Sequence, residues 1–142
     1  MTRTPAQCEA AVRIVAWLDV IRTHIAMHPV AVPVHVSVNI VTENVTVLLD
    51  TASVADTAAG LISWADTLID AAGEVWRVHD GVSVHLSVTG RTPSGIVVRV
   101  FDSVDHHAYT SCGVCLALEP GQRAPLPLDV LRDLAERVQA GP

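Results

Sequence analysis

The chain of 142 residues contains no lysine, and its nine basic residues are all arginine. These arginines are scattered from Arg3 to Arg137, so they form no basic cluster of the kind that neutralises a run of phosphates. The formal net charge of −6 is also too small for a mimic of DNA. The charge pattern therefore argues against a nucleic-acid partner and is typical of ordinary solubility charge.

Long apolar runs and aromatic residues are also scarce. No stretch approaches the roughly 18 apolar residues that a membrane helix needs, so we expect no membrane partner. Arg13 and Asp19 interrupt the apolar residues near the N-terminus, which argues against a signal peptide. Half of the residues are nevertheless apolar, enough for a core without covalent crosslinks. We expect a single α+β domain over residues 1–142.

Cysteine is present three times, an odd number that excludes a fully paired disulfide framework. A reduced, cytoplasmic protein is the simplest interpretation.

Helical signals stand near both ends of the chain and in its middle. Thr4-Pro5-Ala6-Gln7 combines a capping threonine, a proline at the first helical position and a glutamine at the capping-box position. His28-Pro29 ends this first helix. A second helix is predicted from Ser53 to Ala72, closed by Gly73 in the left-handed region, and Gly60 inside it indicates close packing on a neighbour. A last helix is predicted near the C-terminus.

Alternation of apolar and polar residues predicts the strands. The predicted strands span residues 33–40, 45–49, 74–79, 82–89 and 96–100, with a further candidate at 108–118. Hairpin turns such as Asp80-Gly81 join most of them. The order α-β-β-α-β-β-β-(β)-α predicts an α+β fold, with an antiparallel sheet of about four to five strands and two or three helices mainly on one face.

One strand pattern occurs twice. Val34-His35-Val36-Ser37-Val38 returns fifty residues later as Val84-His85-Leu86-Ser87-Val88, and a turn and a second strand follow each copy. Residues 33–50 and 82–103 are thus a candidate internal repeat that would lie side by side in one sheet. The alternative is that valine-rich strands resemble one another without common ancestry.

The helix and hairpin in the middle of the chain carry a resemblance. Ile62-Ser63-Trp64-Ala65-Asp66-Thr67-Leu68 gives a W-A-D-x-L pattern, and Val98-Arg99-Val100-Phe101-Asp102-Ser103-Val104 ends a valine-rich hairpin with V-R-V-x-D. Over about forty residues the chain resembles small uncharacterised proteins of actinobacterial phages and mobile elements. The resemblance implies a phage or mobile-element context, and it carries over no activity and no functional residue.

The densest group of metal-ligand side chains lies late in the chain. His106, His107, Cys112 and Cys115 offer the imidazoles and thiolates that zinc prefers, and a C-x₂-C pair chelates from one turn. A zinc-stabilised module is therefore one hypothesis, although a strong zinc signal has two ligand pairs. In the alternative without a cofactor, both cysteines are small apolar residues of a buried strand. A redox role is a third hypothesis, but no strand-to-helix context supports it.

The outward face of the predicted sheet is the second candidate site. His35, Asn39, His85 and Arg99 all fall on polar positions of the alternating strands. They point to a small binding or accessory protein that acts through protein–protein contacts, with a homodimer or another protein as partner. A small enzyme with a pocket between His35 and His85 is the alternative. The three tryptophans are expected to anchor the core, unless one at an edge serves an interface.

Overall fold

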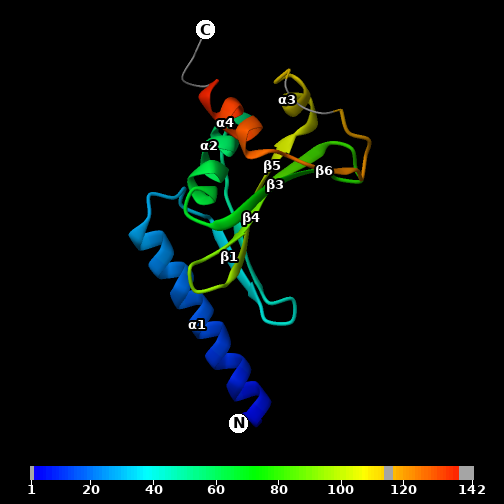
Figure 1. Cartoon of the computed structure of the whole chain (residues 1–142). Coiled ribbons are helices and arrows are strands. Elements are labelled where there is room, and N and C mark those ends of the chain that lie inside the picture. Colours follow the sequence, from blue (N-terminus) through cyan, green and yellow to red (C-terminus); the bar gives the residue numbers. More distant parts are fainter. Residues whose placement is uncertain (1, 114–116, 138–142) are drawn as a thin grey trace.

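The structure is a computed structural model that describes residues 2–113 and 117–137. These residues form an α+β fold in which four helices accompany one six-stranded mixed sheet (Figure 1). The elements, in chain order, are α1 Pro5–Met27, β1 His35–Asn39, β2 Asn44–Leu48, α2 Val54–Ala65, β3 Ile69–Arg77, β4 Ser83–Arg91, β5 Val97–Asp105, α3 His106–Thr110, β6 Arg123–Pro125 and α4 Leu128–Glu136. None of the helices in the described part is long and apolar enough to cross a membrane.

The sheet has the strand order β1-β2-β5-β4-β3-β6. Five strands or fewer were expected, and β6 adds a short sixth that pairs with β3. The expectation of a purely antiparallel sheet is wrong at one place, because β2 runs parallel to β5. Parallel neighbours need a crossover connection, and here the chain between them contains α2, β3 and β4. The pairing places segments 33–50 and 82–103 side by side, while their relation as a repeat stays a prediction.

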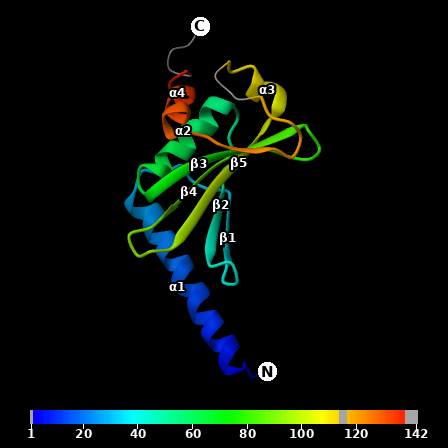
Figure 2. The ribbon, with the colours of Figure 1, turned by 45° about the vertical axis from the view of Figure 1, so that its right-hand side comes forward.

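Helix α1 begins and ends where the sequence predicts. The Thr4 hydroxyl accepts a hydrogen bond from the Gln7 amide at 3.1 Å, and the Gln7 side chain accepts one from the Thr4 amide at 2.8 Å. Its C-terminal half packs on the molecule through the buried Ile21, whereas its N-terminal half extends beyond the sheet (Figures 1 and 2).

One face of the sheet forms the core with α2. Side chains alternate between the two faces of a strand, and the fully buried ones on this face are the valines and leucines of the central strands. Ala58, Leu61 and Trp64 of α2 pack with them and are also fully buried. Figures 1 and 2 both show α2 and α4 together on one side of the sheet.

Helix α2 is shorter than expected. It ends at Ala65, and Ile69 already begins β3, so the residues expected as its last turn are paired with β4. Gly73 therefore lies in the middle of a strand and closes no helix. The apolar residues of segment 69–72 are spaced in a way that fits a helix or a strand. The pairing of β3 with β4 on one side and with β6 on the other favours the strand. Close packing at Gly60 is confirmed, since a Cβ there would lie 2.9 Å from Leu49 Cδ1.

The segment after β5 also differs from expectation. Residues 106–110 form α3, where a strand was the candidate from residue 108. The Asp105 carboxylate caps this helix by accepting hydrogen bonds from the amides of His107 and Ala108. Tyr109 is fully buried and ties the short helix to the core.

Candidate functional site

The strand register defines a second sheet face, turned away from the core. Residues paired directly across neighbouring strands share a face, as do residues two positions apart along a strand. We call this surface the open face, and each strand contributes to it, with His35, Thr46, Trp76, His85, Arg99 and Arg123 as representatives. In contrast to the core valines, these side chains are half-buried or exposed.

Rings and guanidinium groups stack in a continuous row on the open face. The Arg123 guanidinium lies 4.3 Å from the ring centre of Trp76, and the Trp76 ring meets His85 edge-on with centres 5.1 Å apart. The His85 ring lies 5.4 Å from Phe101, whose other contact is the Arg99 guanidinium at 4.7 Å. These five residues form what we call the open-face cluster. Cation–π contacts of this kind attract the guanidinium groups to the ring faces and place them beside the rings.

The cluster carries more positive than negative charge. Glu74 pairs with Arg123 at 2.8 Å. Within the described residues the Arg99 guanidinium has no hydrogen bond or ion pair, although it is half-buried, so its N–H donors remain free for an anion. The pKa of His85 is lowered by burial first, and then by the positive charges of Arg99 and Arg123. Asp102 and Asp80 act on the His85 pKa in the opposite direction. On the open face itself two guanidinium groups face the single carboxylate of Glu74, whose charge also acts on Arg99, and this excess of positive charge would be offset by an incoming negative group.

The predicted binding-face residues do not all come together. His85 and Arg99 meet at Phe101. His35 shares their face but lies on the edge strand β1, separated from His85 on β4 by β2 and β5. Three strand spacings correspond to roughly 14 Å, so the two histidine side chains are not in contact, and a pocket between them stays a prediction. The Asn39 side chain stabilises the β1–β2 turn, because its oxygen accepts hydrogen bonds from the amides of Val41 and Thr42.

The predicted metal ligands fall around α3. His106 and His107 open the helix, Cys112 follows it, and Cys115 lies outside the described residues. The Cys112 thiol lies 3.4 Å from the carbonyl oxygen of Ala108. Among residues 2–113 and 117–137, no three His, Cys, Asp or Glu side chains come together as a metal site. The zinc hypothesis stays a prediction.

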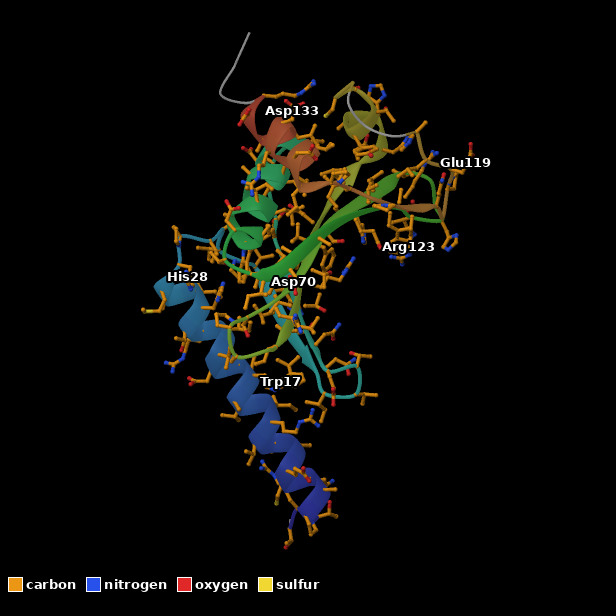
Figure 3. All side chains as sticks on the ribbon, viewed as in Figure 1. Trp17, His28, Asp70, Glu119, Arg123 and Asp133 are labelled. Atoms are coloured by element: carbon orange, nitrogen blue, oxygen red, sulfur yellow. The ribbon has the colours of Figure 1, made fainter. Side chains whose placement is uncertain are left out.

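A separate cleft, with a volume of about 380 Å³, lies between the end of α1 and the β4–β5 loop. His24 and His28 line it from α1, and their ring centres are 4.4 Å apart (Figure 3 labels His28). His24 is buried, stacks on Trp64 and lies 2.7 Å from the Thr67 hydroxyl. That hydroxyl donates its hydrogen to the Trp64 carbonyl, so it accepts one from His24 Nε2. His24 therefore ties α1 to the end of α2.

This histidine makes the stability of the fold depend on pH. Burial, and then the neighbouring His28, lower the pKa of His24 below its usual 6.5. The unfolded chain thus binds a proton more readily than the folded one, and stability is lost as the pH falls below that usual value. We expect His24→Gln to flatten the fall in melting temperature between neutral and mildly acidic pH, measured by circular dichroism. The control is His35→Gln, at an exposed histidine. If the melting temperature of His24→Gln changes with pH as in the wild type, His24 is not the source of the pH dependence.

Sequence reasoning missed three of the five cluster residues. Trp76 was expected in the core, and Phe101 and Arg123 were not singled out. Of Trp76 and His85, only His85 carried a signal, because it occupies a polar position of an alternating strand; next to Trp76 the neighbour Arg77 is polar, and Val78, which shares the face of Trp76, is apolar. Arg123 carried no such signal, since β6 has only three residues. In Figure 3 its label stands at β6, far from Asp133 on α4.

No protein-family model, curated protein or solved structure matches the chain significantly. The resemblance to proteins of actinobacterial phages and mobile elements stays a prediction.

Proposed function

We propose that this protein is a small cytoplasmic binding protein that holds an acidic segment of a partner protein on the open face of its sheet. The observation that carries the proposal is the row of Arg123, Trp76, His85, Phe101 and Arg99 on a face that does not belong to the core.

The composition of this row supports a protein partner. Tryptophan and arginine dominate the energy of protein interfaces, because each combines a large contact area with directional donors. The Arg99 guanidinium lies 4.7 Å from the ring centre of Phe101 and can take a carboxylate in a two-point hydrogen bond. The rings beside it offer apolar area to the rest of the segment. An acidic side chain flanked by apolar or aromatic residues is the ligand that fits both parts.

We expect a random peptide library selected on the immobilised protein to yield peptides rich in Asp and Glu. Arg99→Ala should weaken their binding by about tenfold or more, since a charge-assisted hydrogen bond contributes about 1.5–3 kcal/mol. Trp76→Ala should weaken it similarly through the lost ring contact. Fluorescence anisotropy of one labelled peptide measures all variants.

Arg132→Ala is the matched control. This arginine is exposed and pairs with Asp66 at the contact of α4 with α2, away from the open face. Peptide binding should be unchanged in this variant. Selected peptides without acidic residues, or equal losses for Arg99→Ala and Arg132→Ala, would contradict the proposal. A labelled single-stranded oligonucleotide that binds through Arg99 more tightly than the peptides would instead assign the face to nucleic acid.

A further inference from the structure

Helix α1 is apolar on two opposite sides. Trp17 and Ile21 on one side pack against the core, and Trp17 is labelled on that side in Figure 3. On the other side Val12 and Val15 are 69% and 66% exposed. An apolar stripe on a helix is normally buried against another element. The outer side of α1 therefore has the composition of an interface, yet no described part of this chain covers it.

The outer side forms a shallow apolar groove with opposite charges at its two ends. Cys8, Ala11, Val12, Val15 and Ala16 line it, with Arg3 at the N-terminal end and Asp19 at the other. Cys8, Val12, Val15 and Asp19 follow one another at spacings of four, three and four residues. This is the spacing at which the seam of a two-helix coiled coil repeats.

We infer that this groove binds the same groove of a second copy of the chain, with the two α1 helices antiparallel. Within each copy Asp19 pairs with Arg22 of the same helix. The opposite charges at the two ends of the groove still favour a second copy in the antiparallel orientation. When Val12 of one copy lies opposite Val15 of the other, Asp19 lies opposite Cys8, beside which Arg3 enters the groove. The symmetry of such a contact repeats the Asp19–Arg3 attraction at both ends. A parallel pair would instead set Asp19 against Asp19 and Arg22 against Arg22.

The interface is independent of the proposed function, because residues of the N-terminal segment and of α1 line the groove, whereas the open-face cluster belongs to β3, β4, β5 and β6. Figure 2 shows the N-terminal end of α1 extending away from these strands. Small side chains at Cys8, Ala11 and Ala16 let the two helix backbones approach closely. The contact removes the exposed valines from water, which is the main gain.

Light scattering after size-exclusion chromatography tests whether two copies of the chain associate. The full chain at tens of micromolar should have the mass of a dimer. Val15→Asp should weaken the dimer by about 100-fold, since it buries a carboxylate without a partner. The matched control is Val41→Asp, at a valine 88% exposed on the β1–β2 turn, which should stay dimeric. A monomeric wild type, or a dimer that survives Val15→Asp, overturns the inference.

Crosslinking tests the orientation, with Cys8 replaced by Ser throughout. An equal mixture of Val12→Cys and Val15→Cys chains should form a disulfide between two copies on oxidation, whereas Val12→Cys alone should not. A disulfide in the Val12→Cys sample alone indicates a parallel pair and overturns the proposed orientation. Charge reversal gives a second readout, made with Arg22 replaced by Ala because Arg22 pairs with Asp19 in the same helix. In that background Arg3→Asp and Asp19→Arg should each weaken the dimer, and the double reversal should restore it. Failure of the double variant to recover counts against the Asp19–Arg3 contact.

Discussion

Replacing Trp64 by alanine should remove a large part of the stability of the fold. Trp64 is fully buried between α2 and the sheet, stacks on His24 and donates a hydrogen bond from its indole N–H to the Ala31 carbonyl at 2.9 Å. Removing a buried tryptophan costs about 3–5 kcal/mol through lost burial and the cavity left behind. The Ala31 carbonyl also loses its donor. Since a domain of this size has a total stability of about 5–15 kcal/mol, urea unfolding followed by circular dichroism should show a much lower midpoint.

Two comparisons make this result specific. Trp64→Phe keeps most of the ring volume and loses the N–H, so we expect a smaller loss of about 1–2 kcal/mol. Trp76→Ala removes a tryptophan of the open face that is only half-buried, and its cost to stability should be well below that of Trp64→Ala. Equal losses for the two alanine variants would mean that Trp76 is a core residue and that the open face is wrongly assigned.

Replacing Gly73 by alanine should detach the C-terminal part of the described chain. A Cβ at this position would lie 2.2 Å from the backbone oxygen of Leu126 and 3.4 Å from Leu131 Cδ1. Leu126 also donates its amide to the Gly73 carbonyl at 2.9 Å, so the two backbones are held together there. To make room, the connection between β6 and α4 must move away. We expect a loss of about 3 kcal/mol in urea unfolding, at the upper end for overpacking.

Limited proteolysis locates the effect, because cleavage should become faster within residues 118–137. Gly60→Ala is the control. Its Cβ would meet the flexible end of Leu49, and alanine is favoured over glycine in a helix by about 1 kcal/mol, so the net loss should be smaller. If Gly73→Ala unfolds no more easily than Gly60→Ala, the close approach of Leu126 is not needed for the fold.

Local signals in the sequence were sufficient for some elements of this protein. The capping box at Thr4 and Gln7 and the His28-Pro29 end placed α1 almost to the residue, because these interactions involve neighbours in the chain. The alternation of residues 82–89 and the Asp80-Gly81 turn predicted the β3–β4 hairpin for the same reason. The α+β fold followed from the order of these elements.

Other features depend on contacts between distant segments. The three tryptophans look alike in the sequence, but Trp64 meets the core and Trp76 meets Arg123, which lies 47 positions later in the chain. Whether residues 69–72 continue a helix or begin β3 depends on the partner strands, and so does the parallel pairing of β2 with β5. The sequence by itself determined the helix caps, the hairpins and the alternation of the strands, whose energies are local. Only the tertiary structure decided the strand order and the open-face cluster, because hydrogen bonds between strands and ring contacts depend on which segments meet in space.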